Sequence, residues 1–254
     1  MIGIFDSGIG GLSVLIELKK RAPDLDVTYW GDTKNVPYGT KKKGELEVLM
    51  ANNIHELIKR GATHILNACN TMSTVMTRGD LVFEENTDIK IIEMVQPTVH
   101  ALAQYKKQIL ILATPATIAS EIYQREFERV GISVKTRAIP ELALAIESGK
   151  DEKEQTRVIE NALSQEVIQS IEIIALCCTH YPFAERLFKK VLQENGSHAK
   201  LFNPAIAVAE KVIERFGGKG EGKLQFFISR DSSVFRDVVA KNFTDFAYSI
   251  NVAL

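Results

Sequence analysis

Short apolar runs alternate with amphipathic segments along most of the chain. The runs contain few polar residues, which is typical of parallel strands covered by helices on both faces. In the segments between them, apolar residues recur at the spacing of helices that bury one side. The runs predict strands over 2–5, 27–30, 64–67, 89–94, 109–113, 133–138, 171–176, 200–202 and 224–228. The segments predict helices over 12–21, 43–60, 118–130, 152–169 and 184–194. This alternation predicts an α/β fold with mostly parallel sheets.

A faint internal duplication indicates two similar lobes. Residues 2–6 align with residues 110–114 at an offset of 108 positions. Cys69 and Cys178 repeat this relationship at an offset of 109. Ligands bind beyond the carboxyl ends of parallel strands, so both sets of strand ends are expected around one shared cleft.

Two prolines suggest where the chain changes lobe. The pattern is interrupted near 96–97 and again near 203–204. We therefore expect a first lobe of residues 1–94 plus 206–254. Residues 95–205 are expected to form the second lobe.

The composition removes several functional classes. With 254 residues, of which 45% are hydrophobic and 25% charged, the chain suits a globular protein of one or two domains. A formal net charge of −1 creates no overall field favouring nucleic acid or an anionic membrane. The start lacks a signal-peptide pattern, and no apolar run reaches the roughly 18 residues of a membrane span. We expect a cytoplasmic protein with neither kind of partner.

The three cysteines indicate reactive chemistry or burial, not a disulfide framework, because their number is odd and two are adjacent. Cys69 and Cys178 each close an apolar run and are predicted to begin a helix, where the helix dipole favours a thiolate. A single such cysteine is more often a small buried apolar residue. The matched pair suits a reaction in which one face of a carbon loses a proton and the other gains one. Cys177 has no counterpart and is assigned to packing.

The polar residues after each cysteine have two readings. Asn70, Thr71 and Thr179 follow the thiols, and their side chains and amides can hold a carboxylate. Alternatively, the threonines are helix N-caps without a ligand. His180 can exchange a proton near neutral pH and tune Cys178, or it is a packed loop residue.

A glycine-rich turn follows the first strand, over residues 6–11. It matches neither the dinucleotide-binding nor the phosphate-loop pattern, so its glycines are expected to let backbone approach a small ligand. Asp6 can pair with a substrate ammonium group or help activate a thiol; the alternative is a helix N-cap. Residues 32–39 predict a rigid turn with exposed amides. Thr114 and Thr117, after a second-lobe strand, can donate further hydroxyl groups.

Six segments together resemble glutamate racemase, the cofactor-independent enzyme that supplies D-glutamate for bacterial peptidoglycan. They run in the family's order and cover essentially the whole chain. The segments are FDSGIGGL at 5–12, GD at 31–32, VPYG at 36–39, ACNT at 68–71, ATPAT at 113–117 and CTHYP at 178–182.

The resemblance implies two α/β lobes related by a pseudo-twofold axis, with the active site between them. It implies that Cys69 and Cys178 are the two bases, one on each face of glutamate, assisted by Asp6 and His180. Asp32 and Glu147 match further acidic positions associated with catalysis. The implied substrate contacts are Asp6, Ser7, Pro37, Tyr38, Gly39, Asn70, Thr71, Thr114, Thr117, Thr179 and His180. It also implies no cofactor or metal, a role in cell-wall biogenesis and cell shape, and a homodimer.

Two residues depart from the family's pattern. Met72 stands where the family often has a small residue, and Cys177 stands where it often has glycine. The first strand begins almost at the N-terminus. We therefore expect no leader of the kind found in members that respond to a cell-wall precursor, and no such activation.

Three other functions stay open on the residues alone. A sister racemase acting on aspartate or a hydantoin would use the same two cysteines. A cysteine hydrolase would use Cys178 as nucleophile and His180 as base, and would leave Cys69 without a role. A noncatalytic two-lobed amino-acid binding protein needs neither thiol.

Overall fold

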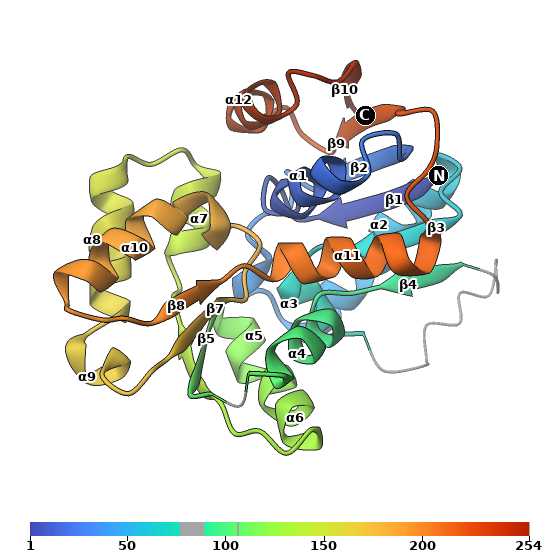
Figure 1. The fold of residues 1–254 in the computed structure, drawn as a ribbon. Coiled ribbons are helices and arrows are strands. Elements are labelled where there is room, and N and C mark those ends of the chain that lie inside the picture. Colours follow the sequence, from blue (N-terminus) through green and yellow to red (C-terminus); the bar gives the residue numbers. More distant parts are fainter. Residues whose placement is uncertain (77–88, 106, 254) are drawn as a thin grey trace.

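The computed structural model describes residues 1–76, 89–105 and 107–253, and within them two parallel β-sheets are covered by helices (Figure 1). All of their neighbouring strands pair in parallel. The larger sheet has the order β10 (Tyr248–Val252), β9 (Leu224–Ile228), β2 (Val27–Gly31), β1 (Ile2–Asp6), β3 (His64–Asn67) and β4 (Lys90–Ile92). The smaller has the order β6 (Lys135–Ala138), β5 (Ile109–Ala113), β7 (Ile173–Leu176) and β8 (Lys200–Phe202). The predicted α/β fold with parallel sheets is confirmed.

The two sheets repeat one arrangement of strands. In the larger sheet β1 lies between β2 and β3, and in the smaller sheet β5 lies between β6 and β7. The strands that precede Cys69 and Cys178, β3 and β7, therefore occupy equivalent places. The larger sheet takes its strands from residues 2–92 and 224–252, and the smaller from 109–202. The lobe boundaries given above stay a prediction.

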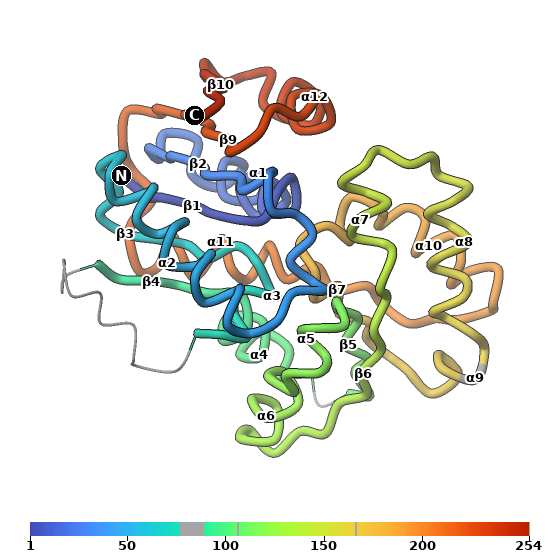
Figure 2. Tube along the Cα trace, turned by 180° about the vertical axis from the view of Figure 1, so that it is seen from behind, coloured from blue at the N-terminus to red at the C-terminus, as the bar shows by residue number. Residues whose placement is uncertain are grey.

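Helices cover both sheets and also join them. Helix α11 packs against α1 and α4, and α8 packs against α10. Figure 2, seen from behind, shows the C-terminal elements β9, α12 and β10 returning to the N-terminal lobe. The longer helices are α1 (Leu12–Arg21), α2 (Lys43–Lys59), α4 (Val95–Ala103), α6 (Ile122–Arg129), α8 (Glu152–Ala162), α10 (Glu185–Glu194), α11 (Pro204–Phe216) and α12 (Ser233–Asn242). The shorter helices are α3 (Asn70–Ser73), α5 (Pro115–Ala119), α7 (Leu142–Glu147) and α9 (Gln165–Ile168), with the 3-10 turns η1 (Tyr38–Thr40) and η2 (Tyr181–Ala184).

The apolar pattern accounts for the centre of each sheet. Every residue of β1 and β5 is buried, as expected for apolar strands covered on both faces. Helix α1 buries Leu12, Leu15 and Leu18 on one side, as its spacing predicts. Ile4 and Leu176 belong to one buried cluster, so the core continues from one lobe into the other. No helix in the described residues combines the length and apolarity needed to cross a membrane.

Two predicted helices are wrong in extent. The segment 118–130 is broken between α5 and α6, where Glu121 adopts a left-handed conformation with φ of 55°. The segment 152–169 is broken after α8. The apolar pattern continues across both breaks. The tertiary structure, and not local periodicity, therefore decides where these helices end.

The pattern also missed one strand and misread two prolines. Strand β10 is largely exposed at the sheet edge and therefore lacks an apolar pattern. Pro97 and Pro204 do not interrupt structure but lie in the first turns of α4 and α11. Proline is tolerated there because first-turn N–H groups have no partner within the helix.

Candidate active site between the two lobes

Strand ends from both sheets converge on a small enclosed cavity of about 30 Å³. That volume holds little more than one water molecule. Cys69 and Cys178 both line it and are only 6% and 5% exposed. The complete lining is Ser7, Val36, Pro37, Tyr38, Gly39, Thr40, Cys69, Asn70, Thr71, Thr114, Pro140, Ala143, Leu144, Cys178, Thr179 and His180.

Most of the predicted site residues are therefore brought together. Four of them, Asp6, Asp32, Thr117 and Glu147, are not among the lining residues and reach the cavity through other side chains. No motif in the sequence indicated the second-lobe wall formed by Pro140, Ala143 and Leu144.

Cys69 is held by its backbone at the point where β3 ends and α3 begins. Its N–H donates to Asn67 Oδ1 at 3.0 Å, and Ser73 Oγ donates to its carbonyl at 3.1 Å. Its side chain makes no capping hydrogen bond to the first turn of α3. Sequence reasoning missed Asn67; its only signal is an amide residue at the end of an apolar strand.

At Cys69, burial outweighs the start of the helix in setting the pKa of the thiol. Burial, and then the nearby Asp6 carboxyl, raise the pKa of the Cys69 thiol well above its ordinary value. The backbone amides of Met72 and Thr71 lower the pKa but offset only part of this rise. A four-residue helix supplies too little dipole to overcome burial, so Cys69 is a thiol at neutral pH.

Cys178 is not followed directly by a helix, which corrects the second helix-start prediction. A turn continues through Thr179 and His180, and η2 begins only at Tyr181. His180 Nδ1 lies 3.9 Å from Cys178 Sγ, and His180 Nε2 lies 2.7 Å from Glu147 Oε2. The imidazole therefore connects the thiol to a buried carboxylate.

These contacts determine the charge of His180. Burial alone lowers its pKa, but the hydrogen bonds and charge interactions with Cys178 and Glu147 outweigh burial and raise the pKa well above its ordinary value. Cys178 thus lies beside this imidazole, whereas Asp6 is the carboxyl that acts on Cys69. The two cysteines consequently have different electrostatic environments.

Asp6 is fully buried and connects the lobes, so the helix N-cap reading is wrong; Gly11 occupies that position before α1. Asp6 Oδ1 accepts a hydrogen bond from the Gly8 N–H at 3.0 Å, and Asp6 Oδ2 accepts one from the Thr179 hydroxyl of the other lobe at 3.1 Å. Burial raises the pKa of Asp6, although His180 and the Gly8 amide act in the opposite direction.

The glycine-rich turn approaches side chains of the other lobe. A Cβ atom at Gly8 would lie 2.3 Å from Glu147 Oε1, and one at Gly10 would lie 2.5 Å from Thr179 Oγ1. The Ile9 N–H donates to Glu147 Oε2 at 2.9 Å. The turn thus receives the carboxylate that holds the imidazole.

Hydroxyl groups of other predicted residues make hydrogen-bond contacts on two walls of the cavity. Thr114 Oγ1 lies 2.8 Å from Thr71 Oγ1 and 3.0 Å from Thr117 Oγ1. On the other wall, Tyr38 donates its hydroxyl hydrogen to Asp32 Oδ2 at 2.6 Å. Asp32 therefore holds Tyr38, which lines the cavity.

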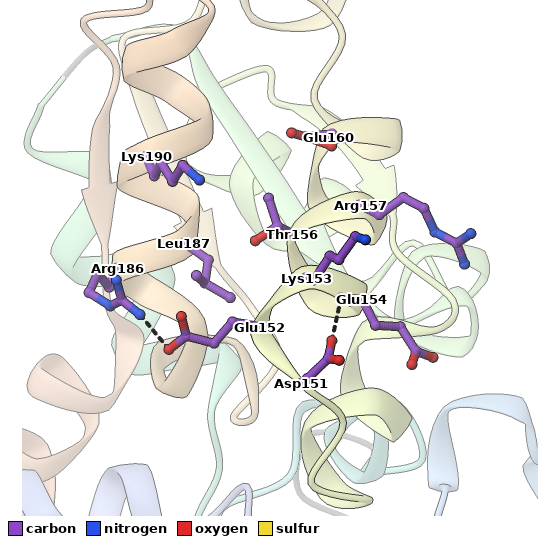
Figure 3. A pocket seen from close by; sticks show the side chains of 10 residues that line it. All are labelled: Asp151, Glu152, Lys153, Glu154, Thr156, Arg157, Glu160, Arg186, Leu187 and Lys190. Carbon is purple, nitrogen blue, oxygen red and sulfur yellow. Dashed lines mark hydrogen bonds and ion pairs between the residues drawn. The ribbon is translucent and has the colours of Figure 1, made fainter.

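A larger open hollow of about 840 Å³ lies between α8 and α10 (Figure 3). Several of its charged groups are already engaged: Arg186 pairs with Glu152, and Asp151 accepts the Glu154 N–H at 2.8 Å. Its lining contains none of the predicted site residues. The inter-lobe cavity is therefore the candidate active site.

Comparison with known proteins gives consistent matches. A family model described as Asp/Glu/Hydantoin racemase matches residues 17–212. A glutamate racemase of Carboxydothermus hydrogenoformans is 32% identical over 248 residues, which are 93% of this chain and 89% of that protein.

Solved structures agree. Glutamate racemase from Francisella tularensis subsp. tularensis SCHU S4, solved in complex with D-glutamate, is 25% identical with a TM-score of 0.84, over 100% of this chain and 97% of that one. The isoform RacE1 from Bacillus anthracis shares the fold at 24% identity with a TM-score of 0.85, over the same shares of the two chains.

Proposed function

Because the chain belongs to the Asp/Glu/Hydantoin racemase family, we propose that it interconverts L- and D-glutamate by proton transfer between Cα and two cysteines. The observation that carries this proposal is the placement of Cys69 and Cys178 after equivalent strands of two similar sheets, on one cavity. A single base would tend to return the proton to the face it left. Two bases on opposite faces allow inversion.

The unequal environments of the cysteines define the starting state. Burial raises the pKa of Cys69 and keeps it as the thiol, so we assign the thiolate that the reaction needs to Cys178, which lies beside His180. The Cys178 thiolate removes the α-proton, and the electron pair of the C–H bond stays on the substrate as a carbanion. The Cys69 thiol then delivers its proton to the opposite face. The cysteines have now exchanged protonation states, and the reverse reaction uses the same groups in opposite roles.

The carbanion needs stabilisation, because an α-proton beside a carboxylate is very weakly acidic. Fixed hydrogen-bond donors in a closed site stabilise developing charge more strongly than water does. Asn70, Thr71 and Thr179 line the cavity, and the Asn70 carboxamide, the Thr71 hydroxyl and the backbone amide of Thr179 can supply such donors without a cofactor. Asp6 orients Thr179 through its hydrogen bond.

Substrate entry requires the lobes to separate. A cavity of about 30 Å³ is far smaller than an amino acid. The contacts that must open are those between the glycine turn and Glu147, Thr179 and His180. Closure then removes water from the thiols and strengthens the electrostatic interactions within the site.

The cellular role follows from the activity. We place the enzyme in the cytoplasm, where it supplies D-glutamate for peptidoglycan synthesis and so supports cell-wall biogenesis and cell shape. We also infer that it acts as a homodimer. The named activity of its relatives and the D-glutamate complex of one of them support the proposed activity, from which this role is inferred.

The deciding experiment is incubation of the purified protein with L-glutamate in D₂O without added cofactor. Circular dichroism follows inversion, and NMR follows deuteration at Cα. Inversion together with deuteration supports the proposal. If glutamate neither inverts nor exchanges, the proposal is wrong. Turnover of L-aspartate in parallel would then indicate a sister racemase, and a hydrolytic product would indicate a hydrolase.

A further inference from the structure

The Asn70 carboxamide is held at one end only. Its Oδ1 accepts a hydrogen bond from the Tyr123 hydroxyl at 2.5 Å. Its Nδ2 is buried and has no hydrogen-bond partner among the described residues. An unpartnered buried donor is costly in a folded protein and often indicates a ligand contact. Because Asn70 lines the inter-lobe cavity, the two Nδ2 hydrogens are available to a ligand there.

Tyr123 reaches Asn70 from the other sheet's side of the cavity. It lies on α6 and packs in a buried cluster with Phe127 and Cys177. The ring is therefore fixed by packing, and its hydroxyl donates across the cavity to Asn70 Oδ1.

We propose that Tyr123 is a positioning residue whose hydroxyl fixes the Asn70 carboxamide, so that Nδ2 donates to a carboxylate group of the substrate. The inference rests on the proposed function, because it names a carboxylate as the group received. If the amide were free to rotate by half a turn, its oxygen would face the carboxylate and repel it. The Tyr123 hydroxyl opposes that rotation, because it donates its hydrogen to Oδ1 and a rotated amide would take this acceptor away.

The direct test is Tyr123→Phe, which keeps the ring and removes the hydroxyl. We expect KM for both enantiomers to rise about tenfold, and kcat to change by less than about threefold, since one substrate contact is weakened in both directions. The matched control is Tyr181→Phe, which removes another buried tyrosine hydroxyl, one that donates to the Ile139 carbonyl at 3.0 Å. A purely structural role would lower the melting temperature of both variants and leave KM of both unchanged, which would overturn the proposal.

A double-mutant cycle shows whether Tyr123 acts through Asn70. Asn70→Ala removes the positioned group, so adding Tyr123→Phe to it should raise KM no further. Independent, additive increases in KM would overturn the proposal.

A measurement without turnover separates this inference from the proposed function. The Asn70 side-chain amide signals in a ¹H–¹⁵N spectrum are assigned by their loss in Asn70→Asp. We expect them to shift and broaden in Tyr123→Phe and to stay in place in Tyr181→Phe. Unchanged Asn70 signals in Tyr123→Phe contradict the inference whatever the substrate is. If the parent fails to racemise glutamate while these signals do shift, the proposed function and the carboxylate assignment fail, and the positioning contact stands.

Discussion

His180 Nε2 lies 2.7 Å from Glu147 Oε2, and both side chains are buried. The same carboxylate oxygen accepts the Ile9 N–H from the other lobe, so the imidazole is oriented by a group that also bridges the cavity. Lobe closure and the charge of His180 are thereby connected through one carboxylate.

The first prediction concerns the two thiols. Cys69→Ala and Cys178→Ala should each lower the rate of glutamate inversion by at least about a thousandfold. The two thiols act as one catalytic unit, so the loss of either costs nearly as much as the loss of both. Inversion is followed by circular dichroism in both directions, and thermal unfolding verifies the fold of each variant. Near-parent inversion by either variant would exclude the two-base mechanism.

The second prediction is a pH dependence of stability. The pKa of His180 is raised in the folded protein, so the stability it contributes is complete below its ordinary pKa of about 6.5 and is lost as pH rises through the raised value. The free energy of unfolding of the parent, measured with urea, should therefore fall with rising pH more steeply than that of His180→Asn. Glu147→Gln is the companion variant, because it removes the charge that helps raise this pKa. Equal slopes in parent and His180→Asn would contradict the prediction.

The third prediction is that Asp6 is kept at a cost in stability. Its raised pKa means that ionisation is less favourable in the folded protein than in the unfolded chain. Asp6→Asn should thus increase the free energy of unfolding at neutral pH by about 1 kcal/mol, while inversion falls at least about tenfold. The gain should shrink as pH is lowered towards about 4, where the carboxyl is increasingly protonated. A variant less stable than the parent at neutral pH would show that the carboxylate's hydrogen bonds outweigh its burial.

The fourth prediction concerns the glycine turn. Gly8→Ala places a Cβ atom 2.3 Å from Glu147 Oε1, so it should destabilise the fold by about 1–3 kcal/mol and reduce turnover by displacing the carboxylate from His180. Gly44→Ala is the control, because a Cβ there meets no atom within 4 Å and the residue lies in helix α2. That change should leave turnover unchanged and stabilise the protein slightly. The comparison uses chemical denaturation and initial rates. Equal effects of the two substitutions would refute the packing argument.

Much of the fold could be predicted because strand and helix periodicity are local properties. Within the described residues, apolar runs placed nine of the ten strands near their observed positions, and helix α1 has the predicted bounds. Local patterns failed where position in the sheet or packing decided the outcome. Strand β10 is an exposed edge without an apolar face, and Glu121 breaks a helix within a favourable pattern.

The candidate site divides in the same way. The sequence by itself determined which side chains end the strands, because Cys69, Cys178 and their polar successors are motifs of adjacent residues. Only the tertiary structure decided their charge and their partners. Burial raises the pKa of the Cys69 thiol, and Cys178 together with Glu147, which lies 33 positions away in the chain, raises the pKa of His180. Desolvation and Coulomb interactions depend on distances in space, so no local pattern specifies them.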